Sequence, residues 1–230
     1  MTPKITNLQS AIKSLVEPGM QVAIEGFTHL IPFAAAQEII RQGITGLTLI
    51  RLTPDVIYDQ MIGMGCANKL IFSWGGNPGV GSLHRLRDAV ENSWPTSLEL
   101  DERSHAAMCV AYTAGASGLP FGALRGFVGS DLPQYNDSIR FLDCPFTKEK
   151  LAVTSAIQPD VAIIHAQQAD RQGNVMLWGI VGVQKDIALA AKRVLVTVEE
   201  VVDKFAEKSN VTVLPSWTID TICEVPGGAS

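Results

Sequence analysis

The chain has 230 residues, of which 47% are apolar and 18% are charged. This composition predicts a globular protein, because disordered chains are poor in apolar residues and rich in charge. The formal net charge is −5, and the Lys and Arg residues are scattered without a basic run, which argues against nucleic acid and anionic membranes as partners.

The four cysteines, Cys66, Cys109, Cys144 and Cys223, lie far apart and form no C-x-x-C pair. This spacing excludes zinc ribbons and redox pairs and favours a reduced compartment. The first residues lack the apolar core of a signal peptide. No apolar run approaches the roughly 20 residues that span a bilayer. The sequence therefore predicts a soluble, cytoplasmic protein.

Short apolar runs typical of strands alternate along the chain with segments of helical periodicity. Asn7 or Thr6 is expected to cap the first helix, and Pro32 to open the second. Further helices are expected after Asp55, after Ser82, and over residues 185–191. The expected strands are 21–25, 47–52, 70–74, 98–100, one beginning at 161, 175–178, 194–198, 211–214 and 219–225.

This alternation predicts one α/β domain over residues 1–230, with an open, mainly parallel sheet and helices on both faces. Residues 121–146 are rich in Gly, Pro, Asp and Asn, so we expect irregular, exposed chain there. Glu199 and Glu200 are expected to begin a short helix.

The strand that begins at Val161 changes within a few positions into polar residues, among them His165, Gln168 and Asp170. Polar side chains at the carboxyl end of a buried strand lie where open α/β sheets bind ligands. An ordinary strand followed by a solvated loop explains the same pattern. The stretch therefore leaves a binding role and a structural role open.

Glycine-containing loops follow several expected strands and supply the candidate binding residues. Glycine lets backbone N–H groups approach a ligand, and a helix start favours an anion. The loop 75–81 is neither G-x-G-x-x-G nor a Walker A sequence, so it does not support a dinucleotide or a nucleoside triphosphate. The residues expected to bind substrate are Gly26, Phe27, Gly75, Gly76 and Asn77.

Glu102 is the candidate catalytic carboxylate. Asp101 is expected to cap a helix running from Glu102 to Tyr112, which places Glu102 within one turn of Arg103 and His105. A first-turn glutamate is favoured by the helix dipole alone, and it is equally a candidate general base or nucleophile. The sequence contains no serine elbow, no H-E-x-x-H and no metal-spaced carboxylate cluster, so no metal site is expected.

Several segments, taken in chain order, resemble the alpha (A) subunits of family I coenzyme A transferases. The similarity is nearest to the glutaconate-type branch, which also includes ring-opening hydrolase subunits of bacterial steroid degradation. The segments cover nearly the whole chain, and they are 18–32 with its Glu-Gly-Phe, 114–121 with 129–132, 160–175, 191–203 and 225–229.

The resemblance implies a CoA transferase-like fold and an enzyme of αβ or paired αβ subunits that acts on an acyl-CoA without a permanently bound cofactor. In the transferases, the acyl-CoA is attacked by a glutamate of the beta subunit. This chain lacks that subunit's Ser-Glu-Asn-Gly motif, and Glu25-Gly26 is a poor substitute, so the nucleophile is expected on a partner beta subunit. His165 and Asp170 are then expected to shape their loop.

Two alternatives remain open from the sequence. In the hydrolase branch the important glutamate lies on the alpha chain, at a position similar to Glu102, which would then act on a cyclic acyl-CoA. The chain could also be a non-catalytic binding or scaffolding subunit that has kept only the fold.

Overall fold

The computed structural model describes residues 3–76 and 81–229. Ten strands within these residues form one large sheet. They are β1 (Lys4–Ile5), β2 (Gln21–Glu25), β3 (Leu47–Ile50), β4 (Ala67–Phe72), β5 (Glu99–Glu102), β9 (Val161–Asp170), β10 (Val175–Trp178), β11 (Arg193–Val202), β12 (Val211–Leu214) and β13 (Thr221–Glu224). The order β1-β13-β11-β9-β2-β3-β4-β5 is parallel throughout, and β10 pairs antiparallel with β9 and β12. The predicted open, mainly parallel sheet is confirmed.

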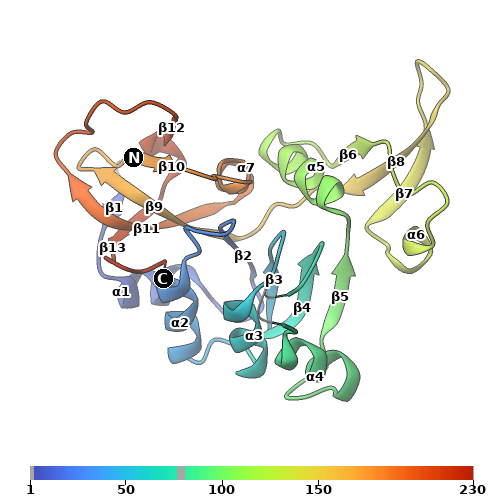
Figure 1. Cartoon of the computed structure of the whole chain (residues 1–230), viewed down its shortest axis with the longest axis horizontal. Coiled ribbons are helices and arrows are strands. Elements are labelled where there is room, and N and C mark those ends of the chain that lie inside the picture. Colours follow the sequence, from blue (N-terminus) through green and yellow to red (C-terminus); the bar gives the residue numbers. More distant parts are fainter. Residues whose placement is uncertain (1–2, 77–80, 230) are drawn as a thin grey trace.

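Helices cover both faces of this sheet, as the sequence predicts (Figure 1). Four lie on one face and two on the other, and none within the described residues is long and apolar enough to cross a membrane. The first four are α1 (Leu8–Leu15), α2 (Phe33–Arg41), α3 (Val56–Gly63) and α4 (His84–Asn92), and the other two are α5 (His105–Ala116) and α7 (Gln184–Ala190).

The central strands are apolar because both of their faces are buried. In β2, Val22 and Ile24 pack toward α1, α2 and α3, whereas Ala23 packs toward α5 and α7. Burying one large aliphatic side chain stabilises the fold by roughly 1.5–3 kcal/mol. Two hydrophobic cores therefore fix the sheet from both sides and make the ends of its strands a rigid platform.

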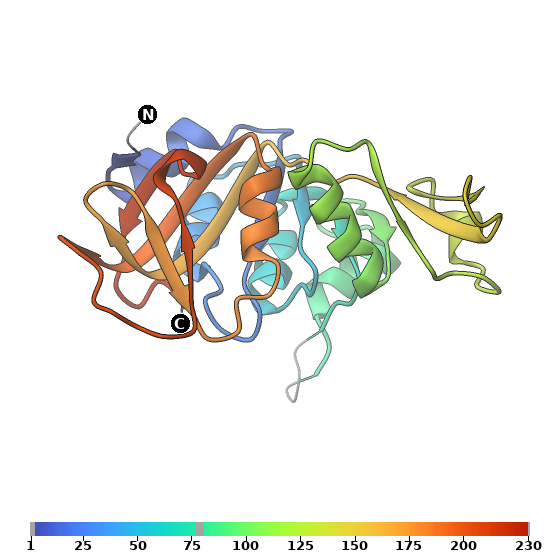
Figure 2. The ribbon, with the colours of Figure 1, turned by 90° about the horizontal axis from the view of Figure 1, so that it is seen from above.

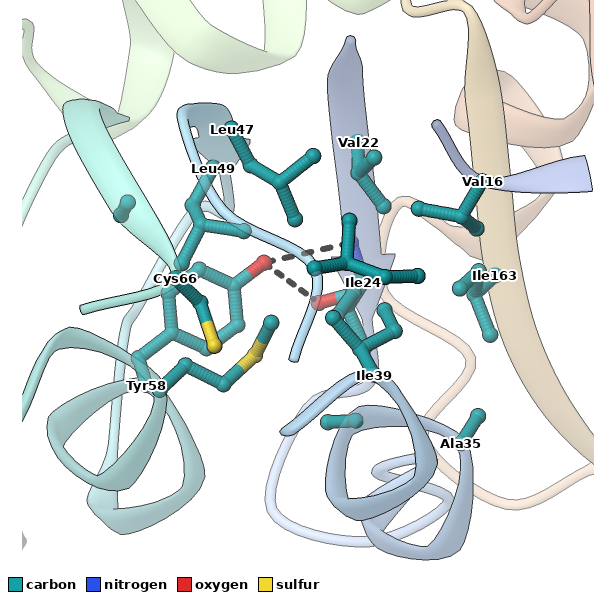
Figure 3. Packing of buried hydrophobic residues seen from close by; sticks show 14 of the residues in the cluster. Val16, Val22, Ile24, Ala35, Ile39, Leu47, Leu49, Tyr58, Cys66 and Ile163 are labelled. Atoms are coloured by element: carbon teal, nitrogen blue, oxygen red, sulfur yellow. Dashed lines mark hydrogen bonds between the residues drawn. The ribbon is translucent and has the colours of Figure 1, made fainter. Parts of the chain in front are cut away.

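Tyr58 of α3 brings a hydroxyl into the first of these cores (Figure 3). The hydroxyl donates to the carbonyl oxygen of Ile50 at 2.8 Å and accepts the N–H of Ile24 at 3.2 Å. A buried hydroxyl is costly unless it is hydrogen-bonded, and here both of its roles are used. The contact ties α3 to β2 and β3 close to the carboxyl ends of these strands.

The expectation of irregular chain over residues 121–146 is wrong. Part of it forms a second, antiparallel sheet in the order β6-β8-β7, which extends to one side of the molecule beyond α5 (Figures 1 and 2). Its elements are β6 (Phe121–Leu124), α6 (Leu132–Tyr135), β7 (Ile139–Asp143) and β8 (Lys150–Ser155). The Gly, Pro, Asp and Asn residues fall largely in the turns between these strands.

The expected helix start at Asp101 and Glu102 is also wrong. Both residues belong to β5, where they pair with Ile71 and Phe72 of β4. Helix α5 begins only at His105, and the hydroxyl of Ser104 caps it by accepting the N–H of Ala107 at 3.1 Å. The sheet register extends the strand past the point where the local capping pattern predicted a helix.

Two further local predictions fail because a distant element supplies the partner. Glu199 and Glu200 do not begin a helix, because β11 continues beyond them alongside β9. Ser82 does not cap α4, which begins at His84. The carboxylate of Asp59 in α3 instead accepts the N–H groups of Arg85 and Leu86 in the first turn of that helix.

Candidate active site

A cavity of about 660 Å³ opens at the carboxyl ends of β2, β3 and β4 and at the start of α5. Ligands of open α/β sheets collect at this edge, because the loops that leave the strands carry polar groups there. The volume lies within the roughly 300–1,000 Å³ that is typical of small-molecule sites. The cavity is lined by Phe27, Thr28, Ile31, Arg51, Thr53, Asp55, Val56, Trp74, Gly76 and His105.

Arg51, the residue after β3, brings a buried cation into the cavity wall. Its Nη1 and Nη2 donate to the two carboxylate oxygens of Asp55 at 3.0 and 2.9 Å, and Nη2 also donates to the carbonyl oxygen of Gly26 at 3.0 Å. Asp55 also caps α3 by accepting the N–H of Ile57. A two-point bond of this kind fixes the guanidinium, and Asp55 offsets its charge within the wall.

Glu25 ends β2 behind that wall and is only 2% exposed. Its Oε1 accepts the hydroxyl of Tyr112 at 2.6 Å and the N–H of Leu52 at 2.8 Å. Burial raises the pKa of Glu25 to about 7, although the charge of Arg51 and these hydrogen bonds act in the opposite direction. Glu25 is therefore a titratable carboxyl group built into the support of the site.

His105 opens α5 at the opposite side of the cavity. Its Nδ1 lies 3.0 Å from the hydroxyl oxygen of Ser73, and that hydroxyl donates to the carbonyl oxygen of Leu52 at 2.6 Å. Ser73 and Leu52 belong to the segments that follow β4 and β3. The ring of His105 is therefore oriented by two neighbouring strand ends.

The loop 26–31 forms another wall of the cavity, and its backbone is tightly constrained. Thr28 and Leu30 have φ values of 61° and 55°, in the left-handed region that most side chains disfavour. Gln184 of α7 holds the loop by donating to the carbonyl oxygens of Glu25 and Leu30 at 3.3 and 3.1 Å. A Cβ on Gly26 would overlap the backbone of Leu30, so the loop requires glycine at this position.

Gly26→Ala should therefore disrupt the site. Because the added methyl meets backbone and not a flexible side chain, we expect a loss of about 3 kcal/mol in the free energy of unfolding and at least a tenfold loss of activity. The matched control is Gly126→Ala, where the methyl meets only the side chain of Leu124, 3.5 Å away. Urea unfolding of both variants measures the difference, and equal stability would contradict the close approach at Gly26.

A cavity at the carboxyl edge of a parallel sheet does not by itself identify an enzyme, and comparison with known proteins supplies the family. The model of the family described as coenzyme A transferase matches residues 5–225. The chain belongs to the coenzyme A transferase family. It is an A-type subunit of that family, for which the CoA thioester is a substrate and not a resident cofactor.

Relatives of this CoA transferase subunit share nearly its whole length. The A-type subunit of 3-oxoadipate CoA-transferase from Pseudomonas knackmussii is 60% identical over 98% of this chain and 80% of that protein. The crystal structure of glutaconate CoA-transferase from Acidaminococcus fermentans has a TM-score of 0.89 at 32% identity, covering 98% of this chain and 76% of that one. The cholesterol ring-cleaving hydrolase IpdA subunit of Rhodococcus jostii is 26% identical over 98% of this chain and 79% of its own length.

The predicted binding residues of this CoA transferase subunit do not all reach the cavity. Phe27 and Gly76 line it, and Gly26 lies in its support through the bond to Arg51. Gly75 instead lines a smaller hollow beside α4, and Asn77 lies outside the described residues. Their roles in binding stay predictions.

Glu102 ends β5 with an exposed side chain, and it is not among the residues that line the 660 Å³ cavity. Its side chain points to the strand face opposite Asp101 and Arg103, because side chains alternate along a strand. The carbonyl oxygen of Glu102 accepts a hydrogen bond from Asn136. Its catalytic role also stays a prediction. Within residues 3–76 and 81–229, no cluster of His, Cys, Asp or Glu is arranged to hold a metal ion.

The sequence did not single out Arg51, Trp74 or His105 as residues of the cavity. Arg51 was included in a strand expected over 47–52, whereas β3 ends at Ile50. The sequence signal for Arg51 was a charged residue directly after an apolar strand, with Asp55 four positions later as a possible ion-pair partner. His105 was considered only as a neighbour of Glu102.

The polar stretch of β9 lies outside the cavity. Asp170 accepts the N–H groups of Gln172 and Asn174, so the expectation that it shapes the turn is confirmed. The expectation that His165 shapes the loop is wrong, because the residue lies buried within β9, with its ring nitrogens 2.8 Å from the hydroxyl of Thr197 and from the carboxylate of Glu199. The strand itself continues through both residues, beyond the point where the sequence suggested a loop.

Proposed function

We propose that this subunit completes the active site of a transferase that moves CoA between an acyl-CoA and a 3-oxo dicarboxylic acid of the 3-oxoadipate type. The observation that carries the proposal is the 60% identity to the A-type subunit of a 3-oxoadipate CoA-transferase, which extends over 98% of the chain. The cavity at the carboxyl edge of the sheet is the proposed contribution of this subunit.

The attacking carboxylate is proposed to come from the partner beta subunit. Asp55 is the carboxylate in the described lining of the cavity, and both of its oxygens are engaged by Arg51. Glu25 lies buried behind the wall. A carboxylate held in such a two-point bond is a poor nucleophile, because attack on a carbonyl would require breaking that bond.

The proposed reaction transfers CoA from one acid to the other through a glutamyl-CoA thioester. A carboxylate oxygen of the partner's glutamate attacks the thioester carbonyl and the C–S bond breaks. CoA leaves as a thiolate, and an anhydride between the acyl group and the glutamate remains. The thiolate attacks the glutamyl carbonyl of that anhydride, which releases the first acid and forms a glutamyl-CoA thioester. The acceptor carboxylate then attacks the glutamyl-CoA thioester and releases the CoA thiolate from a second anhydride. The thiolate attacks the acceptor's acyl carbonyl in that anhydride, which yields the new acyl-CoA and frees the glutamate.

We also propose that residues 1–230 act as one domain of the A type in the cytoplasm, paired as αβ, or as a dimer of αβ, with a beta subunit. All four cysteines are free thiols, which supports a reducing compartment. The length of the family match, residues 5–225, supports a single functional unit.

Purified complex of the two subunits tests the proposal. Incubation with an acyl-CoA followed by borohydride should trap the glutamyl-CoA thioester as a reduced residue on the beta subunit, located by mass spectrometry. A trapped residue on this chain would overturn the assignment of the nucleophile. A complex that neither binds nor exchanges CoA esters would favour a non-catalytic role for the fold.

Glu102→Gln distinguishes transfer from ring-opening hydrolysis within the same complex. Glu102 remains the proposed general base if the substrate is a cyclic acyl-CoA, and its exposed position at the end of β5 supports access to a ligand or partner. For the transferase we expect exchange within about threefold of wild type, because no proton needs to be removed. A loss of about 10²-fold or more in the hydrolysis of a cyclic acyl-CoA, the usual contribution of a general base, would favour the hydrolase.

A further inference from the structure

We propose that the cavity receives the pantetheine arm of the CoA thioester, and that Nε2 of His105 accepts a hydrogen bond from an amide N–H of that arm. The inference rests on the proposed function, since it assumes that a CoA thioester is the ligand. His105 would then bind the uncharged arm of the substrate and take no part in the chemistry at the partner's carboxylate.

The hydrogen bonds of Ser73 fix the tautomer of His105. The carbonyl oxygen of Leu52 is an acceptor only, so the 2.6 Å contact requires the Ser73 hydroxyl to donate its one hydrogen there. The Ser73 oxygen therefore meets Nδ1 of His105 as an acceptor, and Nδ1 must carry the hydrogen across the 3.0 Å bond. In the neutral ring this leaves Nε2 with a lone pair and no hydrogen.

The charges of Arg51 and Asp55 in the described lining of the cavity are paired with each other. The cation of its described lining is Arg51, whose two terminal nitrogens are already held by Asp55 and by the carbonyl oxygen of Gly26. The wall thus presents an internally matched ion pair. Within the described lining, the guanidinium of Arg51 is thus already paired and offers no free side-chain cation to a phosphate or carboxylate of either substrate.

The rest of the cavity wall is mostly apolar. Phe27, Ile31, Val56 and Trp74 make much of it apolar, and Trp74 is 46% exposed. An apolar cleft with a few placed polar groups suits a ligand that is mostly uncharged and carries isolated hydrogen-bonding groups. The pantetheine arm has this composition, with two amides and one hydroxyl along an otherwise aliphatic chain.

The donor on the ligand decides between the two substrates. An acceptor nitrogen needs a ligand N–H or O–H, and pantetheine offers two amide N–H groups and one hydroxyl. A 3-oxo dicarboxylate offers carboxylate and carbonyl oxygens, which are acceptors and would be repelled by the lone pair of Nε2. The geometry at His105 therefore favours the CoA substrate over the free acid.

Three substitutions at His105, made in the complete complex of both subunits, separate the two ring nitrogens. In His105→Gln the side-chain oxygen reaches about as far as Nε2 and keeps an acceptor for the ligand, whereas in His105→Asn the amide reaches only as far as Nδ1 and keeps only the contact with Ser73. His105→Ala removes both. We expect kcat/KM for the acyl-CoA to fall about tenfold in the Ala and Asn variants and about threefold or less in the Gln variant. The KM for the acid should stay unchanged in all three.

Acyl-pantetheine analogues in which each amide N–H is replaced in turn by an ester oxygen identify the ligand group. With the analogue that lacks the contacted N–H, wild type and His105→Ala should become equal, because the interaction is missing from both. Saturation-transfer NMR with the same acyl-pantetheines reports binding independently of turnover. Expected results are binding to wild type and weaker binding to the Ala and Asn variants.

The outcomes that overturn the inference differ from those that overturn the function. Variants that raise the KM for the dicarboxylic acid and leave the acyl-CoA unaffected would place the acid in the cavity and refute the inference. Equal losses with amide and ester analogues would refute the proposed hydrogen bond to an amide N–H. A wild-type complex without exchange activity would refute the proposed transferase, while the NMR measurement would still decide whether the cavity binds pantetheine.

Discussion

Replacing Arg103 by methionine should lower the free energy of unfolding by about 3–5 kcal/mol, because it leaves a buried carboxylate without its partner. Arg103 is 3% exposed and donates to both oxygens of Asp101 at 3.0 and 2.8 Å. Its Nη1 also donates to the hydroxyl of Thr154 and to the carbonyl oxygen of Ser155. The guanidinium thus joins β5 of the large sheet to β8 of the small one.

The electrostatics of Asp101 support the size of this effect. Burial raises the pKa of Asp101, but the hydrogen bonds and charge of Arg103, with further bonds from Asn136 and Ser138, outweigh it and hold the pKa below its ordinary value of 3.8. Because the folded pKa is lowered, this stabilisation is present above the unfolded pKa and is lost as the pH falls through the folded one. Arg103→Met should remove that acid-dependent component as well.

Urea unfolding at neutral pH measures the prediction against a surface control. Arg125 forms a similar ion pair with Glu149, but its side chain is 79% exposed and the pair is screened by water, so Arg125→Met should destabilise the protein far less than Arg103→Met. The double variant Asp101→Asn with Arg103→Met should recover part of the loss, because the unpaired charge is removed. Equal effects of the two single arginine substitutions would show that the buried network does not hold the sheets together.

The same residues show why the sequence predicted the fold better than the site. Apolar runs such as 161–164 identify strands buried on both faces, and their alternation with helical segments is enough to predict a parallel sheet. Asp101 and Ser104 are both good helix caps by local rules. Only the pairing of β5 with β4, a contact distant in sequence, places the strand over Asp101 and the cap at Ser104.

The side chains of the cavity were harder to predict because each has a second, local explanation. Asp55 was expected as a helix cap, and it is one, but its carboxylate also holds Arg51. The hydrogen bond between His105 and Ser73, which orients the His105 ring, joins residues 32 positions apart. The glycine-containing loops nevertheless pointed to the edge of the sheet at which the cavity opens, because Phe27 and Gly76 both line it.

Glu25→Gln should change how stability depends on pH, and this is the second large effect that we expect. The folded pKa of Glu25 is raised from 4.5 to about 7 by burial. Between these values the folded chain keeps a proton that the unfolded chain releases, so stability falls as the pH rises through this window and is level above it. The size of the shift corresponds to roughly 3 kcal/mol.

Glutamine is a suitable probe because it keeps the geometry without the titration. One oxygen of Glu25, Oε1, accepts both the hydroxyl of Tyr112 and the N–H of Leu52, and the amide oxygen of glutamine can take the same two bonds. The variant should therefore match wild type near pH 5. It should gain up to about 3 kcal/mol relative to wild type near pH 8, where the buried carboxylate of the native protein is charged.

Urea unfolding of both proteins at pH 5 and pH 8 gives the gap in free energy of unfolding between variant and wild type at each pH. The contributions of the other titrating groups cancel in this gap. The exposed Glu17→Gln is the matched control and should shift neither value by more than about 0.5 kcal/mol. A constant gap between Glu25→Gln and wild type would mean that Arg51 keeps Glu25 charged throughout. In that case the wall behind the cavity would carry a permanent second carboxylate, and Arg51 would be shared between Glu25 and Asp55.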